Sequence, residues 1–205
     1  MPRPRFSRLP VERQQQILEV AARRFAAEGF HGAPLNGILA DAKVSKGAAY
    51  YYFDDKLDLF ATVVEAAWTE VDAEALFQPE DLDAETYWPT LERLYRRQLG
   101  LLSERPWLWR VVRAAGEVAT DPRTGPALME RLGPIFAALQ GVWTRGQALG
   151  LLRTDLPEGL LFAMVGALDQ GIDGWFLEHP EAARGPEGEA LLSRAFGALR
   201  RLAER

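Results

Sequence analysis

Cysteine is absent from this chain of 205 residues, and histidine occurs twice, as His31 and His179. Without cysteine the chain can form no disulfide, no thiolate metal site and no cysteine nucleophile. Two histidines far apart in the sequence leave little from which to build a zinc site. We therefore expect neither a metal nor a cofactor.

Long hydrophobic runs are also lacking. No apolar run approaches the roughly 18 residues that indicate a membrane span. The N-terminus, Met-Pro-Arg-Pro-Arg-Phe-Ser-Arg, has no apolar stretch behind its charges and so does not look like a secretory signal. Hydrophobic residues make up 48% and charged residues 26%, an ordinary globular balance. These features predict a cytoplasmic protein that has no membrane partner.

The net charge of −5 is distributed unevenly along the chain. Residues 1–53 hold 8 Lys and Arg against 4 Asp and Glu, whereas residues 54–205 hold 16 against 25. A basic N-terminal part on an acidic remainder is expected when one end of a protein contacts phosphates. Arg3, Arg5 and Arg8 alternate with prolines and predict an arm without regular structure. The arm is either a frayed terminus or a segment that reaches phosphates or a minor groove.

Helical periodicity runs through the whole chain, and no strand-like alternation of polar and apolar residues is found. The first helix is expected over residues 10–28, with Gly29 at the position where a glycine ends a helix. Asp55 and Asp58 resemble a capping box at the start of a long apolar stripe. We predict an all-α fold, in which a three-helix head of residues 1–53 is joined by a connector helix to a helical-bundle body within residues 54–205.

The stretch from Asn36 to Lys56 predicts two short helices hinged at Lys43-Val44. Ser45 suits the N-cap of the second helix, which carries Tyr50, Tyr51 and Tyr52. Three consecutive residues span about 200° of a helix, so the three rings cannot all point inward. At least one phenol must be exposed on this helix beside Lys46.

Residues 17–60 resemble the tetracycline-repressor-type (TetR) family of transcriptional regulators. The stretch I-L-E-V-A-A-R-R-F-A-A-E-G-F-H-G is similar to the family's first helix. The stretch V-S-K-G-A-A-Y-Y-Y-F-D-D-K-L-D-L-F is similar to its recognition helix and the start of its connector. The resemblance implies a helix-turn-helix head that binds a double-stranded DNA operator and a helical body that dimerises and binds a small molecule.

The same resemblance assigns residues 45–52 to the recognition helix that enters the major groove. The DNA contacts that it implies are Asn36, Ser45, Lys46, Gly47, Ala48, Tyr50, Tyr51, Tyr52 and Lys56, with Lys46 and Gly47 nearest the base edges and Phe53 in the core. Several positions depart from the family pattern. Lys43 stands where the hinge usually has glycine, Ala48 replaces a common hydroxyl residue, and Ala33-Pro34 replaces a Thr-Ser or Thr-Thr pair. These departures leave the operator sequence open.

Two faces near the C-terminus could form the dimer interface. Small residues recur every four positions at Ala163, Ala167 and Gly171, and a leucine-rich face follows in the last helix. The two faces could finish an internal bundle or form a four-helix interface with a second subunit. The residues that we predict at the homodimer interface are Ala163, Ala167, Gly171, Leu192, Phe196 and Leu199.

The body holds an unusual number of tryptophans, which either pack the core or line a pocket. The predicted pocket residues are Trp88, Trp107, Phe136, Gln140, Trp143, Met164 and Asp169, and their character favours a hydrophobic or acyl-type effector. The expected function is a repressor that such a ligand releases from DNA. A constitutive DNA-binding regulator without ligand is the alternative. We expect no enzyme, because Asp169 and Asp173 form a carboxylate pair without a histidine partner.

Overall fold

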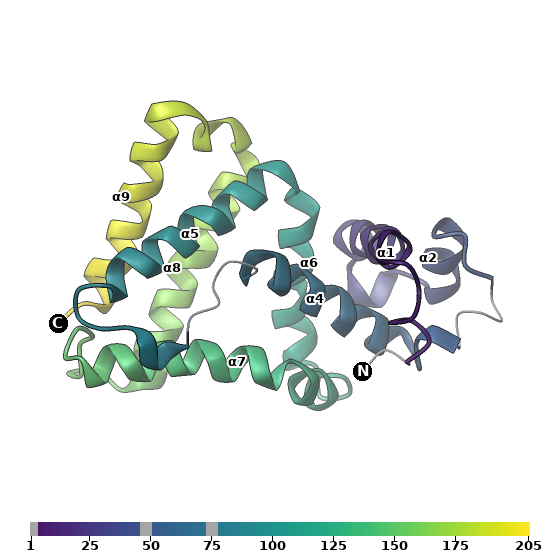
Figure 1. Ribbon diagram of the computed structural model, residues 1–205, viewed down its shortest axis with the longest axis horizontal. Helices are drawn as coiled ribbons and strands as arrows, with labels where there is room; N and C mark the ends of the chain where they lie inside the picture. Colours follow the sequence, from purple (N-terminus) through teal and green to yellow (C-terminus); the bar gives the residue numbers. More distant parts are fainter. Residues whose placement is uncertain (1–3, 46–50, 73–77) are drawn as a thin grey trace. The chain divides into compact units, whose positions relative to one another are not determined.

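The computed structural model describes residues 4–45, 51–72 and 78–205. Apart from one isolated antiparallel bridge, Leu152 to Glu204, the regular structure of these ranges is helical (Figure 1), which confirms the predicted all-α class. The elements are α1 (Val11–Gly32), α2 (Leu35–Asp41), α4 (Lys56–Asp72), η1 (Pro79–Asp81), α5 (Tyr87–Glu104), α6 (Pro106–Thr120), α7 (Gly125–Ala148), α8 (Glu158–Glu178), η2 (Pro180–Ala183) and α9 (Gly185–Ala203).

The chain divides into two compact units. The head unit comprises Met1–Glu70 and Trp107–Ile135, and the body unit comprises Val71–Pro106 and Phe136–Arg205. Helix α6 and the first half of α7 therefore pack with the N-terminal helices, although they are distant from them in sequence. This division describes packing. The functional boundary between residues 53 and 54 stays a prediction.

The core of the head unit is aromatic. Phe25 on α1 is 1% exposed and meets Phe60 on α4 edge to face, with ring centroids 5.0 Å apart. Burying a side chain of this size contributes about 1.5–3 kcal/mol. Gly29 adopts a φ of 69°, so the helical path breaks at the predicted residue before a further turn reaches Gly32. A left-handed conformation costs glycine little because it has no Cβ.

The N-terminal arm is more ordered than its sequence predicted. Residues 4–8 form a turn, and Phe6 is 2% exposed. Its ring lies 4.8 Å from Phe53 and 6.2 Å from Tyr52, between centroids. The sequence did not predict this contact, because Phe6 stands among arginines and prolines. A single aromatic residue in such a segment was the one indication that it packs against the core. Residues 4–8 contain no helix or strand, as predicted, but the burial of Phe6 contradicts a frayed terminus.

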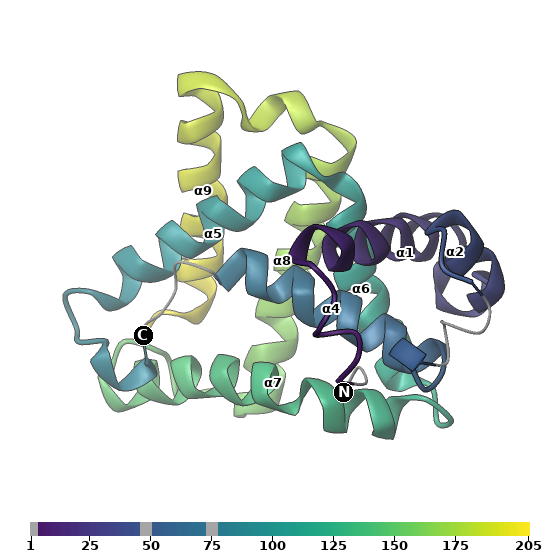
Figure 2. The same cartoon turned by 45° about the vertical axis from the view of Figure 1, so that its right-hand side comes forward.

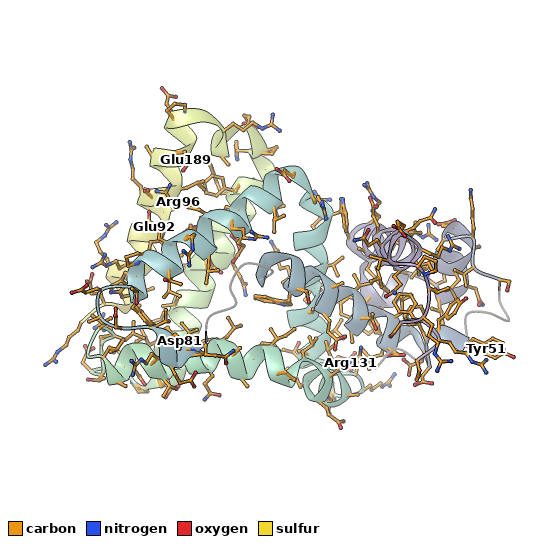
Figure 3. All side chains as sticks on the ribbon, in the orientation of Figure 1. Tyr51, Asp81, Glu92, Arg96, Arg131 and Glu189 are labelled. Atoms are coloured by element: carbon orange, nitrogen blue, oxygen red, sulfur yellow. The ribbon has the colours of Figure 1, made fainter. Side chains whose placement is uncertain are left out.

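A charged cluster, the Arg131 cluster, ties α7 to α4 inside the head unit (Figure 3). Arg131 Nη1 donates to Asp58 at 2.6 Å, and its Nε and Nη2 each donate to Glu65 at 2.6 Å. Its Nη2 also donates to the Thr62 hydroxyl at 3.2 Å. The side chains of Arg131 and Asp58 are only 13% and 8% exposed. The sequence did not predict this cluster, because Arg131 lies more than 60 residues from its three partners.

Asp58 also takes part in the cap of α4. Its backbone N–H donates to Asp55 Oδ1 at 2.8 Å, as the predicted capping box requires. The reciprocal bond is shifted by one residue, because Asp58 Oδ2 accepts from the N–H of Asp54 at 3.1 Å. The Asp58 carboxylate therefore serves both the helix cap and the Arg131 cluster.

In the body unit, α5, α8 and α9 contact one another in all three pairs and lie side by side (Figure 2). The Phe196 ring of α9 lies 5.6 Å from Tyr95 and 6.3 Å from Trp88, both on α5. The leucine-rich face of α9 is thus turned into the subunit, where Leu192 and Leu199 are 3% and 8% exposed. The prediction that Leu192, Phe196 and Leu199 lie at the dimer interface is corrected, since all three are already buried within the subunit.

Candidate functional site

The turn after α2 has a left-handed residue at its hinge, although the hinge residue is lysine and not glycine. Lys43 has a φ of 52°, the left-handed conformation that is uncommon for a residue with a Cβ. Arg13 Nη2 on α1 donates to the carbonyl oxygens of Ala42 and Lys43, each at 2.9 Å. These bonds satisfy carbonyls that the end of α2 leaves free. They hold the turn to α1 although glycine is absent.

Two tyrosines of the predicted recognition helix are described, and they differ in environment. Tyr51 is 52% exposed and points away from the neighbouring helices (Figure 3), whereas Tyr52 is partly buried against Phe6. Phe53 is 2% exposed, which confirms its predicted place in the core. The predictions for Lys46, Gly47, Ala48 and Tyr50 concern positions outside the described residues.

Three further residues of the predicted DNA contacts are described. Asn36 on α2 and Ser45 are exposed. Lys56, at the first residue of α4, donates from Nζ to the His31 carbonyl at 3.2 Å and lies 4.7 Å from the centroid of the Phe30 ring. The end of α1 therefore sets the position of the Lys56 ammonium at a helix N-terminus, where an anion is favoured.

Arg5 lies next to Tyr51, a contact that the sequence did not predict. Its guanidinium carbon lies 4.5 Å from the centroid of the Tyr51 ring. Phe6, buried next to it, anchors the arm so that Arg5 stays beside the exposed phenol. Guanidinium, ammonium, hydroxyl and amide groups of this kind donate to phosphate oxygens and to base edges.

Comparison with known proteins gives the family. The profile of the bacterial regulatory proteins of the tetR family matches residues 17–63. The HTH-type transcriptional repressor SCO4008 of Streptomyces coelicolor is 31% identical over 77 residues, which span 38% of this chain and 40% of that one. The HTH-type transcriptional repressor AcnR of Corynebacterium diphtheriae is 27% identical over 166 residues, 80% of this chain and 78% of that one. Residues 17–63 thus form the segment by which this chain resembles TetR-family regulators.

The fold of the whole chain agrees with that of solved TetR-fold proteins. The fatty acid degradation regulator FadR from Bacillus halodurans superposes with a TM-score of 0.67, covering 91% of this chain and 97% of that chain, at 22% identity. Since identity is this low, the likeness concerns the fold. The match to SCO4008 covers less than half of that repressor's length, so the similarity to it is confined to one part of the molecule.

The predicted pocket residues are spread over both units. Trp107 packs against the core of the head unit, with the Arg23 guanidinium carbon 5.1 Å from its ring centroid. The other six predicted pocket residues belong to the body unit. Phe136, Gln140 and Met164 are exposed. Trp88 is 8% exposed and Trp143 is partly buried. The tryptophan count therefore did not identify a single cluster, because indoles also serve as ordinary core residues.

Asp169 lies in a polar group inside the body unit. Burial raises its pKa to about 6. Burial also raises the pKa of Tyr95 on α5, and the charges of Asp169 and Asp173 raise it further. Tyr95 is 6% exposed, and its hydroxyl has no hydrogen-bond partner among the described residues. Tyr95, Asp169 and Asp173 are therefore polar groups in the interior of the body unit.

The outer face of α8 is apolar and uncovered by the chain itself. Ala163, Ala167 and Gly171 are exposed, as a small-residue interface requires, and nothing lies within 4 Å of a Cβ built on Gly171. Larger apolar side chains flank this stripe, at 37–52% exposure: Leu160, Phe162, Met164 and Trp175. Among the described helices α8 is also the one whose length and mean hydropathy of 1.2 would suffice to cross a membrane, with 17% of that window buried.

Proposed function

We propose that this protein is a dimeric transcriptional repressor that binds a palindromic DNA operator and releases it when a small molecule binds in the body. The observation that carries the proposal is the match of residues 17–63 to the family's helix-turn-helix, with the exposed Tyr51 in its recognition helix. The relatives SCO4008 and AcnR are both named as repressors. The excess of basic residues in the first 53 positions supports contact with phosphates.

A selection experiment tests this function directly. The purified full-length chain is incubated with a pool of random DNA duplexes, and the retained sequences are read after several rounds. We expect a palindrome whose half-sites lie about one helical turn, or roughly 34–36 Å, apart, or a multiple of that distance. A pool that shows no enrichment at low salt would contradict DNA recognition.

Lys56 provides a prediction about the phosphate contacts. The Lys56→Gln variant removes the charge but keeps a donor for the His31 carbonyl. We expect the slope of log K against log salt concentration to decrease by about 1 per half-site. The slope is measured by fluorescence anisotropy on the selected operator. Arg194→Gln, an exposed change on α9, serves as the control and is expected to leave the slope unaltered; an unaltered slope for Lys56→Gln would remove this lysine from the interface.

The uncovered face of α8 supports a homodimer. An apolar surface of this extent on a single helix is usually covered in the functional state of a protein. A second copy that meets it through Ala163, Ala167 and Gly171 allows two helices to approach closely. The carboxylates of Asp169 and Asp173 within α8 fit a helix surrounded by protein better than one in lipid.

We expect Ala167→Glu to give monomers in sedimentation velocity, because a buried carboxylate without a partner opposes association. Ala138→Glu introduces the same charge on an exposed position of α7 and is the matched control. The control should sediment like the wild type. A dimer that persists in Ala167→Glu at micromolar concentration would place the interface elsewhere.

Ligand response follows from linkage. A small molecule that prefers one spacing of the two heads shifts the population toward that spacing and so changes operator affinity. The partly buried Trp143 and the buried aromatic residues around Phe196 support a hydrophobic effector. The second candidate is a constitutive regulator without ligand, which would keep the same operator affinity with every compound tested.

A further inference from the structure

We infer that Lys43 contacts a phosphate of the operator, and that Arg13 is the positioning residue that holds the lysine in its left-handed conformation. The inference rests on the proposed function, because it adds a residue to the surface that meets DNA. It concerns the turn between α2 and Ser45, the predicted N-cap of the recognition helix.

Two backbone hydrogen bonds fix the conformation of this turn. The N–H of Lys43 donates to the Ala40 carbonyl at 2.9 Å. The N–H of Val44 donates to the Leu39 carbonyl at 2.8 Å. This pair of bonds is the Schellman motif, which ends a helix with one residue in the left-handed conformation. Lys43, with a φ of 52°, is that residue.

The residues beside Lys43 leave the turn no other register. Ala42 is 1% exposed and Val44 is 7% exposed. A shift by one position would bring an apolar side chain into solvent and the lysine into the core. The left-handed position therefore falls on residue 43, where glycine is the usual choice because a Cβ is crowded in this conformation.

Arg13 on α1 stabilises the crowded turn. Its Nη2 donates to the carbonyl oxygens of Ala42 and Lys43, each at 2.9 Å. Hydrogen bonds from a charged donor are stronger than those between neutral groups. A residue in a sparsely populated backbone conformation persists only where the surrounding structure over-determines it. Arg13 supplies part of that support from 30 residues earlier in the chain.

The Lys43 side chain has no use inside the described part of the chain. It is exposed, and no hydrogen bond or ion pair with a described residue engages its ammonium. The acid closest to it in sequence is Asp41, whose carboxylate lies 3.3 Å from Nε of Arg24. Backbone strain of this kind is concentrated at functional sites. A lysine in place of glycine is therefore explained best by a partner outside the chain.

The place of Lys43 identifies that partner. It stands two residues before Ser45, which is exposed, and it follows α2, on which Asn36 is exposed. Both residues belong to the predicted DNA contacts. A lysine ammonium is a flexible point charge with three donors, which suits a phosphate better than a base edge. Together with Lys56, Lys43 puts one cation on each side of the predicted recognition helix in the sequence.

The Lys43→Gln variant tests the phosphate contact, because it removes the charge but keeps the Cβ in its crowded position. Binding of the full-length protein is measured by fluorescence anisotropy on the selected operator and on an unrelated duplex of the same length. We expect the slope of log K against log salt concentration to decrease by about 1 per half-site. Affinity at about 0.1 M salt should fall on the order of tenfold on both duplexes. Lys43→Arg keeps the charge and should keep the slope, as should the exposed control Arg194→Gln.

The Lys43→Gly variant should change stability and binding in opposite directions. Glycine relieves the backbone strain, so we expect the thermal midpoint to rise by about 2–4 °C. The salt slope should decrease as it does in Lys43→Gln. A lysine that served only the dipole at the end of α2 would give a lower midpoint and an unaltered slope.

Arg13→Met tests the positioning role. We expect operator affinity to fall about tenfold without a change of the salt slope, because Arg13 bonds to the protein backbone and not to phosphate. In the Lys43→Gly background the same change should cost less than about twofold, since glycine adopts the left-handed conformation without help.

Three results would overturn the inference: an unaltered slope in Lys43→Gln, a loss of affinity confined to the operator, or an Arg13→Met effect of equal size in both backgrounds. A loss confined to the operator would assign Lys43 to a base edge. A wild-type protein that does not bind the selected operator would refute the proposed function. Wild-type binding together with an unaltered Lys43→Gln slope refutes the lysine assignment alone.

Discussion

The Arg131→Met variant is expected to lose about 3–5 kcal/mol of unfolding free energy, because it removes the guanidinium that faces the buried carboxylate of Asp58. Methionine keeps most of the aliphatic stem, so the loss reports the charge and its hydrogen bonds. For a chain of this length, the midpoint of thermal unfolding should fall by on the order of 10 °C. Circular dichroism of the full-length protein measures the shift.

Two controls separate this effect from a general sensitivity to loss of arginine. Arg153→Met removes the partner of Asp155 in an exposed ion pair and should leave the midpoint almost unchanged. Addition of Asp58→Asn and Glu65→Gln to Arg131→Met removes the uncompensated charges and should recover much of the lost stability. If Arg131→Met unfolds at the wild-type midpoint, the cluster contributes nothing to the stability of the head unit.

The Tyr51→Ala variant is expected to abolish specific operator binding while the helical circular dichroism spectrum and the dimer persist. The ring is 52% exposed and lies outside the core, so its removal costs the fold little. At the DNA, each head loses a contact worth about 1–3 kcal/mol, and the dimer loses two. The ring also contacts the Arg5 guanidinium, whose carbon lies 4.5 Å from the ring centroid. Affinity on the selected operator should therefore fall by on the order of 100-fold or more.

Tyr51→Phe distinguishes the two ways in which this side chain could act. The variant keeps the ring and the Arg5 contact but has no hydroxyl group. Near wild-type affinity would assign the effect to ring contacts, for example with a thymine methyl group. A loss as large as that of Tyr51→Ala would assign it to a phosphate hydrogen bond. Wild-type affinity in Tyr51→Ala itself would exclude this residue from the interface.

Local features of the fold followed from the sequence because their causes are local. The break of α1 at Gly29 depends on the missing Cβ of one residue. The cap of α4 depends on Asp55 and Asp58, three positions apart. Helical periodicity predicted the all-α class, and the family resemblance placed Phe53 in the core. The stretch from Ile17 to Phe60 likewise carried its family resemblance in its own residue spacing, which the tetR-family profile over residues 17–63 matches.

Contacts between distant elements did not follow. Arg131 meets Glu65 across 66 residues, and nothing in either stretch indicates the other. Phe6 looked like part of a charged arm until Phe53 and Tyr52 came next to it. The sequence showed that α9 has a leucine-rich face and α8 a face of small residues, but each face could equally well pack inside or meet a second subunit.

The sequence by itself determined the helices, their breaks and the family of the head, since these depend on residues within a few turns of one another. The tertiary structure alone decided which way each amphipathic face turns. It placed Phe196 against α5 and left Ala167 exposed on α8. The burial of a helix face depends on which other helices pack against it, and this is not encoded in the face itself. It also brought Tyr95 and Asp169 together, since the field that a carboxylate experiences is set by the side chains that fold around it.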